Sequence, residues 1–401
     1  MPRRVRRRTG RRRGALVRYV VAATLVRSAD GGAVVAIVLL AHAVGMPGWV
    51  AGLLGASITA PHLLGPFIAR HLDTARDGRA VIAVSAVLHG VLLGAAALLM
   101  PVTWALWPAV LLLISGMFGP MLTGGISSRL PSIAGPDQHA QRRAQSWDVA
   151  TYGFSGTLGP AAVAGIAAAS HPLTATLVLA VASVVGAAAV LALPRQAPPD
   201  PAVDVPTPLR TLEGIWRYGP LRRTLGLTVT VAFSVAALPI HAVAVAPPSG
   251  GASAAGLLVA GYGVGNLLGS AGLMLRPLRG DADRLMTLLS VLVAVTLSLV
   301  VVGPNLPVSL LAFGLAGIAN ALFFAATLAA RSEYAPRAAR GQVFVWVGAL
   351  KIAAGSAGTA TAGAITGSAG WAPLVLAAVL TLLAAGISAL GRARSLPHRS
   401  G

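Results

Sequence analysis

Two charged residues stand inside one of the most apolar stretches of the chain. The segment "ATLVRSADGGAVVAIVLL" (22–39) contains Arg27 and Asp30, which a helix would present on one face because they are three residues apart. In a helix that begins near residue 16, they would lie roughly 17–21 Å deep, close to the middle of a bilayer. A charge there costs at least ~2.5–3.5 kcal/mol, so it normally faces a partner or a water-filled cavity. Two interpretations stay open: a neutralised structural pair, or a carboxylate that accepts a proton.

Other polar residues also fall within apolar runs. Lys351 is the only lysine, and it could pair with a carboxylate or bind an anionic group of a substrate. His62 and His89 could carry protons, although a histidine among apolar neighbours is more often a packing residue. The candidates for a cavity wall are Tyr262, Asn266 and Asn320, of which Asn320 could equally form an interhelical hydrogen bond.

The composition excludes a soluble domain. Of 401 residues, 56% are hydrophobic and only 10% are charged, whereas soluble domains have about 25% charged residues. The absence of cysteine excludes disulfides and cysteine-based metal sites. There is no phosphate-binding Gly-rich loop with a lysine, no His/Glu metal cluster and no Ser/His/Asp constellation. We therefore expect an integral membrane protein that is not an enzyme and has no cofactor.

Twelve apolar runs are long enough to cross a bilayer as helices. Turn residues such as "GMPG", "SHP" and "GPNLP" separate them. The sequence thus predicts an all-α protein with twelve transmembrane helices, near 16–42, 48–69, 80–100, 104–128, 146–169, 172–193, 222–246, 252–275, 285–303, 306–330, 342–366 and 371–391.

The positive charges alternate with these runs. The loops after even-numbered runs contain arginines, whereas those after odd-numbered runs contain no lysine or arginine. By the positive-inside rule, both termini and the even loops are cytoplasmic, as expected for a multi-pass protein of a bacterial inner membrane. The net charge of +20 includes nine arginines within residues 1–18. This basic tail is interpreted as a topology signal that touches anionic lipid, not as a nucleic-acid site.

A proline- and charge-rich stretch interrupts the pattern at mid-chain. Residues 194–220 are therefore interpreted as a cytoplasmic linker between two six-helix halves. Trp147, Gly156 and Gly159 recur 199 positions later, as a Trp and two glycines, which indicates an internal repeat of the kind that is typical of transporters. The predicted parts are a basic tail (1–15), an N-terminal half (16–193), the linker, a C-terminal half (221–391) and a second tail (392–401).

Over nearly its whole length, this arrangement resembles the major facilitator superfamily of secondary transporters. The family signature after helix 2, G-x-x-x-D-R-x-G-R-R, is partly matched by "GPFIARHLDTARDGR", in which Ala69 replaces the aspartate and Asp73 or Asp77 could supply the carboxylate. The resemblance implies a charged cytoplasmic gate; the alternative is a basic loop that only sets topology. The gate candidates are Gly65, Arg70, Asp73, Arg76, Asp77, Gly78 and Arg79, with Asp148 expected to pair with a loop arginine.

The fifth run, "GTLGPAAVAG", is similar to the antiporter signature of family exporters at Gly159 and Pro160. Small residues there could instead simply allow close helix packing. The fourth run, "LLLISGMFGPMLTGG", lacks the arginine of the family's proton-driven members. The efflux signature and the abundant arginine and alanine resemble drug-efflux members from actinobacteria.

The leading interpretation is alternating access with proton-coupled efflux of a small amphiphilic compound, such as a drug or secondary metabolite. The alternatives are uptake or facilitated exchange of a small metabolite, and a non-transporting membrane scaffold or sensor. The expected partners are a small-molecule substrate, protons and the lipid bilayer, with no nucleic acid and a monomeric state.

The charge alternation makes a direct prediction about topology. A reporter that is active only in the cytoplasm should be active when fused at residue 200 or 401 and silent when inserted at 246–251 ("APPSGG"). The opposite pattern would overturn the helix count.

Overall fold

The computed structural model describes residues 2–196, 198, 204–245, 252–303, 305–366 and 369–395. The described residues form helices joined by short turns, and no strand occurs among them. They divide into two compact units. Unit 1 comprises residues 1–211 and 336–349, and unit 2 comprises 212–335 and 350–401.

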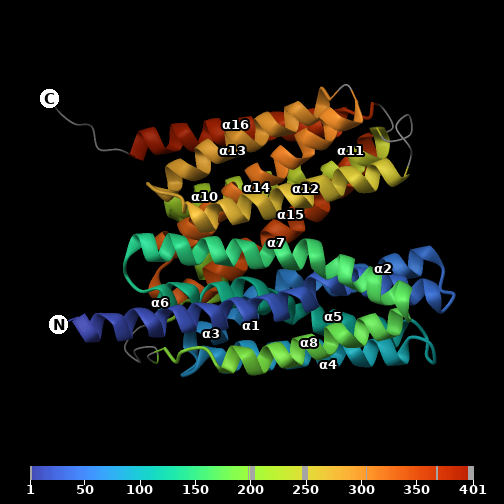
Figure 1. Cartoon of the computed structure of the whole chain (residues 1–401), viewed down its shortest axis with the longest axis horizontal. Coiled ribbons are helices and arrows are strands. Elements are labelled where there is room, and N and C mark those ends of the chain that lie inside the picture. The colour runs from blue at the N-terminus through green and yellow to red at the C-terminus, as the bar shows by residue number, and fades with distance from the viewer. Residues whose placement is uncertain are drawn as a thin grey trace. The chain divides into compact units, whose positions relative to one another are not determined.

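In unit 1, α1 (Pro2–Ala43) packs along α7 (Gln138–Ala169) and α8 (Pro172–Leu191), and α8 packs on α4 (Gly78–Leu99) (Figure 1). α1 begins well before residue 16, so much of the predicted tail is helical. The remaining elements are α2 (Gly48–Thr59), η1 (Ala60–Leu64), α3 (Gly65–Thr74), α5 (Leu106–Pro120), η2 (Met121–Gly125), α6 (Leu130–Ala134) and η4 (Arg337–Ala339).

Two predicted spans of unit 1 change their helical geometry partway, and prolines explain both changes. Pro61 and Pro66 lack the N–H that an α-helix needs, and a 3₁₀ turn, η1, joins α2 to α3 around them. Pro120 ends the regular part of α5 and is followed by the π-helical turn η2. Such π turns are often found at functional sites.

Unit 2 is built around α12 (Ala252–Leu275), which packs on α14 (Leu306–Tyr334). A Cβ at Gly265 or Gly317 would overlap the backbone of the opposite helix, so these glycines allow the two helices to touch. The other helices are α10 (Gly219–Val235), α11 (Leu238–Val245), α13 (Ala282–Val301) and α16 (Ala372–Ser395). α9 (Pro208–Arg217), which lies inside the predicted linker, and α15 (Arg340–Ile365) have residues in both units.

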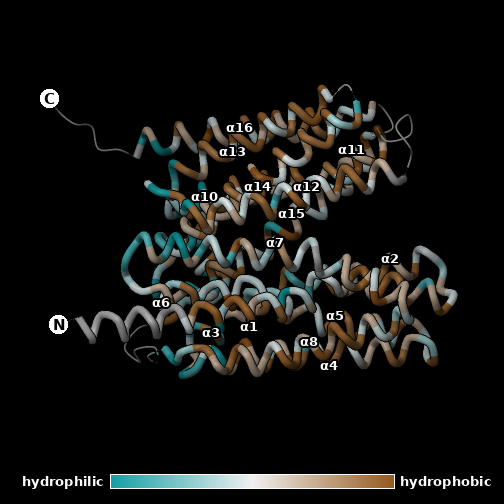
Figure 2. Tube along the Cα trace, viewed as in Figure 1, coloured by the Kyte–Doolittle hydropathy of each residue, from teal (hydrophilic) through white to brown (hydrophobic). Residues whose placement is uncertain are grey.

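Eleven described helical stretches are long and apolar enough to cross a membrane. They correspond to eleven of the twelve predicted spans. The stretch predicted at 146–169 lies in α7, whose polar residues lower its mean hydropathy, and Figure 2 shows hydrophilic colour at the start of this helix. α7 nevertheless packs along α1, so its polar side chains have partners inside the protein. The chain is thus an all-α integral membrane protein.

Candidate functional site

The most deeply buried charges of unit 1 form an ion pair between α1 and α7. Arg27 Nη1 lies 2.7 Å from Asp148 Oδ1, and each side chain is only 1% exposed. The structure therefore places Asp148, and not the neighbouring Asp30, against Arg27. It also gives Asp148 a partner on α1 in place of the expected loop arginine.

Hydroxyl groups add further hydrogen bonds to this pair, while the buried Arg27 Nε has no partner among the described residues. Tyr19 Oη donates to Asp148 Oδ1 (2.5 Å), and Ser127 Oγ donates to Asp148 Oδ2 (2.8 Å). Arg27 donates to Ser127 Oγ (2.7 Å), to the Thr123 carbonyl (3.2 Å) and to Thr151 Oγ1. The guanidinium also lies 3.7 Å from the centre of a tyrosine ring on α7. Because both charges are neutralised and hydrogen-bonded, the network can exist in a low dielectric, where removing one member costs about 3–5 kcal/mol.

Asp30 has a different partner. His62 Nε2 of η1 lies 3.5 Å from Asp30 Oδ1, and the Asp30 side chain keeps 12% of its surface exposed. α5 passes this pair at Gly119, where a Cβ would clash with His62 Nε2 and lie 2.6 Å from Asp30 Oδ1. Three segments thus pack closely around one carboxylate and one imidazole. His62 Nδ1 is buried and has no hydrogen-bond partner among the described residues.

The second histidine, His89, joins α4 to α5. Its Nδ1 lies 3.0 Å from Ser115 Oγ, and that hydroxyl also donates to the His89 carbonyl (3.1 Å). His89 is fully buried. These contacts are those of a buried packing residue, which was the interpretation that the sequence favoured for His89.

The candidate gate loop reaches the start of α15 inside unit 1. The Asp73 carboxylate accepts the backbone N–H groups of Gly341 (2.8 Å) and Gln342 (2.9 Å). A carboxylate at a helix N-terminus satisfies free N–H groups and complements the helix dipole. Nearby, the indole of Trp346 donates to the Pro208 carbonyl (2.9 Å). Asp73 therefore joins α3 to α15 through backbone groups.

Asp77 caps the N-terminus of the next helix, α4. It accepts the backbone N–H of Arg79 (3.1 Å) as the N-cap of α4, and the Arg79 guanidinium lies 2.7 Å from its other oxygen. The hydrogen bonds from Arg79 lower the pKa of Asp77 to about 2. Because this pKa is depressed on folding, the contribution to stability is present above pH ~4 and lost as the pH falls toward 2. Arg79 also donates to the carbonyls of Leu191 (2.8 Å) and Leu193 (2.5 Å).

The other gate candidates differ in their contacts. Arg70 donates to the Val205 carbonyl (3.3 Å), whereas Arg76 is exposed. Gly65 and Gly78 allow close approach, because a Cβ would overlap Pro120 at Gly65 and the Arg129 guanidinium at Gly78.

The antiporter-like segment of α7 faces α1. A Cβ at Gly159 would lie 3.5 Å from the Ser28 carbonyl oxygen, and one at Gly31 would lie 3.1 Å from that of Ser155. Pro160 follows within the same helix. Small residues here let α1 and α7 approach beside the Arg27–Asp148 pair.

The candidate residues of unit 2 lie on three helices, α12, α14 and α15. Lys351 Nζ lies 4.1 Å from the centre of the Phe324 ring. Tyr262 and Asn266 are one turn apart on α12, where a Cβ at Gly317 of α14 would overlap their backbone. Asn320 follows three residues later on α14.

The sequence interpretation missed the partners of Arg27 and Asp30. Asp148, Thr151, Tyr152 and Ser155 follow the i, i+3, i+4, i+7 pattern of one helix face, which could have indicated a polar surface turned inward. For Gly119 the sequence signal is weaker. A glycine before a proline indicates an irregular helix, but it does not indicate which side chains the glycine contacts. No group of three or more metal-ligating side chains occurs among the described residues.

No family model and no curated protein matches this chain. Its fold is that of solved major facilitator superfamily transporters. The human organic anion transporter MFSD10 matches with a TM-score of 0.74 at 17% identity, covering 93% of this chain and 99% of that one. The proton:xylose symporter XylE has a TM-score of 0.74 at 13% identity, with 97% and 96% covered. A bacterial homologue of the iron transporter ferroportin, in an outward-facing state, also gives 0.74, at 14% identity, with 95% and 100% covered.

The close packing around Asp30 makes a prediction about Gly119. Gly119→Ala should destabilise the protein by about 1–3 kcal/mol, because the added methyl group overpacks against His62 and Asp30. Gly156→Ala on α7 is the matched control, since a Cβ added there would meet no atom within 4 Å, and it should not destabilise. Thermal unfolding in detergent measures both, and equal midpoints for the two variants would contradict the close packing of Gly119 against Asp30 and His62.

Proposed function

We propose that the protein is a secondary transporter that works by alternating access and that Asp30 and His62 form its proton-coupling site. One observation carries this proposal: the Asp30 carboxylate, within a membrane-spanning helix, faces a titratable imidazole and not an arginine. An aspartate held by arginine would stay charged, whereas an aspartate beside a histidine can gain a proton when its surroundings become dry.

The pair can hold one proton or two. With one proton shared between the carboxylate and the imidazole, the pair is neutral overall. A second proton neutralises the carboxylate and leaves a net charge of +1 on His62. A change between a wet and a dry environment alters the cost of that net charge, so loading and release can follow the two states of an alternating-access cycle.

The Arg27–Asp148 pair supports this assignment by exclusion. Arg27 binds Asp148, Ser127 and Thr151, so it does not form the structural pair with Asp30 that was one of the two alternatives from the sequence. Asp30 is thereby left for titration. The fourth run contains no basic residue of its own. Arg27 of α1 supplies a buried arginine next to it, because Arg27 donates to the Thr123 carbonyl.

We further propose that the end of α3 and the loop that joins it to α4 act as the cytoplasmic gate. Its support is the pair of hydrogen bonds that the first N–H groups of α15 donate to the Asp73 carboxylate, which require that α3 and α15 be close. The termini and the linker would then be cytoplasmic in a bacterial inner membrane, in agreement with the arginine-rich even loops.

Efflux of a small amphiphilic compound remains the leading direction, supported by the Gly159–Pro160 segment that lines the contact of α7 with α1. Uptake is the second candidate, since one similar structure is a proton symporter. Proton coupling at Asp30 serves either direction. We propose a monomer as the transporting form.

Asp30→Asn tests the coupling role. The amide keeps the size of the side chain but cannot titrate, so substrate accumulation driven by a pH gradient should fall to the level of protein-free vesicles. Downhill exchange of the same substrate should persist. Asp204→Asn changes an exposed aspartate of the linker region and should leave both activities intact.

The assay uses purified protein in vesicles, normalised to folded protein, with a substrate found by a growth-inhibition panel in a host that lacks its own exporters. Continued uphill accumulation by folded Asp30→Asn would rule out this site. No transport of any compound by the wild type would overturn the transporter proposal itself.

A further inference from the structure

A groove of about 490 Å³ opens on unit 1 where the start of α1 meets α6 and the start of α7. Val17 and Val21 of α1 form one wall and are 63% and 49% exposed. Ala140 and Ala144 of α7 keep the groove open because their side chains are small. Trp147 also lines the groove, one turn after Arg143.

The single charged residue of the lining has no counter-charge. Arg143 is exposed and makes no hydrogen bond or ion pair with any described residue. Two other arginines of this unit do have partners: Arg18 donates to the Ala192 carbonyl (2.9 Å), and Arg79 binds Asp77. Arg143 therefore leaves a positive charge at an otherwise apolar groove.

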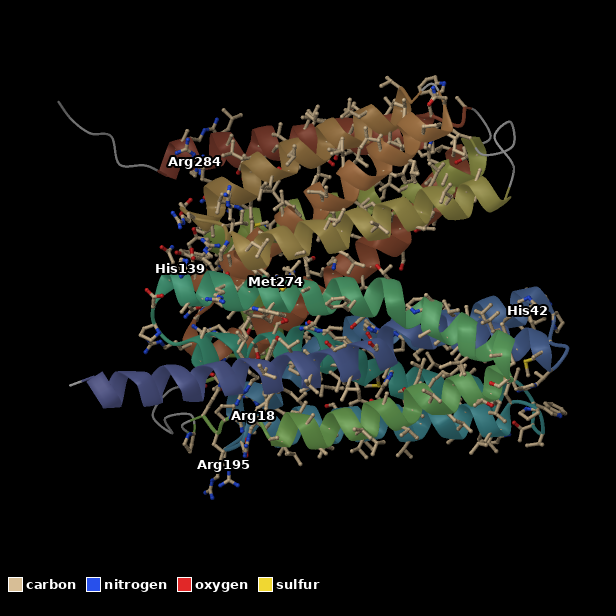
Figure 3. All side chains as sticks on the ribbon, viewed as in Figure 1. Arg18, His42, His139, Arg195, Met274 and Arg284 are labelled. Carbon is tan, nitrogen blue, oxygen red and sulfur yellow. The ribbon has the colours of Figure 1, made fainter. Side chains whose placement is uncertain are left out.

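The groove lies at one end of the membrane-spanning helices. Its α1 residues belong to the first two turns of the span that begins at Gly14, and its α7 residues to the first turns of that helix. Figure 3 shows Arg195 and His139 at this end of unit 1 and His42 at the opposite end. Most arginines of the chain belong to this side of the predicted topology, which is the cytoplasmic side.

We propose that this groove binds one anionic phospholipid of the cytoplasmic leaflet. An acyl chain would lie against Val17, Val21 and Trp147, and the headgroup phosphate would meet Arg143. The apolar lining suits a hydrocarbon chain, and the single free guanidinium suits one phosphate. Cytoplasmic leaflets are rich in anionic lipid, and tryptophan is enriched at the depth where headgroup and chain meet. The site is separate from Asp30 and does not depend on the transport function.

Trp147 provides a site-specific probe, because brominated acyl chains quench tryptophan fluorescence on contact. The protein is prepared in detergent and titrated with brominated phosphatidylglycerol or brominated phosphatidylcholine. Subtracting the signal of Trp147→Phe from that of the wild type isolates this tryptophan from the other six. We expect quenching of Trp147 to saturate at a lower concentration of the anionic lipid, by a factor of about five, as one arginine near anionic lipid is worth about 1 kcal/mol.

Arg143→Gln should remove this preference, so that both lipids quench Trp147 over the same concentration range. The signal of Trp147 in this variant is isolated by subtracting that of the double variant Arg143→Gln/Trp147→Phe. Ala144→Leu should weaken both lipids by filling the groove. Arg284→Gln, which removes an exposed arginine of unit 2, is the charge-matched control and should keep the fivefold preference. Thermal unfolding establishes that each variant is folded. Equal quenching by the two lipids in the wild type, or an unchanged preference in folded Arg143→Gln, would overturn the proposal.

Discussion

A charge buried between membrane helices must be neutralised where it lies, and the Arg27–Asp148 pair is the place where unit 1 meets this requirement. Neither side chain reaches water, and neither could remain there without the other. The pair and its hydroxyl ligands join α1 to α7 and to the segment that follows Pro120. The positions of these three segments, and of the residues that they carry, therefore follow from one interaction.

Close helix packing follows from the same requirement. For Arg27 to reach Asp148, α1 and α7 must lie near each other, and small residues such as Gly31 and Gly159 permit that approach. One turn further along α1, Gly119 of α5 leaves room for Asp30 to meet His62. Two carboxylates buried in the same unit thus acquire different chemistry. Asp148 is fixed by an arginine and two hydroxyl groups, while Asp30 keeps a titratable neighbour and some exposure.

The sequence predicts the helices well and the pairings poorly, for a physical reason. Apolar run length and arginine alternation act locally, so twelve runs and their order can be counted along the chain. A pairing such as Arg27 with Asp148 joins residues 121 positions apart and depends on the rotation and crossing of two helices. Because Asp30 is close to Arg27 along the chain, it was the obvious partner. Residues three apart on one helix lie on the same face, but each side chain can instead bind residues of a neighbouring segment, as Arg27 binds Asp148.

The candidate gate shows a second limit. The sequence marks Asp73 as a carboxylate in the right loop, but its partners are backbone N–H groups, which have no signature in residue type. His62 illustrates a third limit. A histidine in an apolar run is ambiguous until its neighbours are known, and only the path of η1 past α1 places it against Asp30.

The assignment of Arg27 to Asp148 is tested most directly by two double-mutant cycles measured as free energies of unfolding in detergent. One cycle combines Arg27→Ala with Asp148→Ala, and the other combines Arg27→Ala with Asp30→Asn. The first should show a coupling energy of about 3 kcal/mol, and the second should be additive within about 0.5 kcal/mol. A larger coupling of Arg27 to Asp30 than to Asp148 would contradict the separation of a structural pair from a proton site.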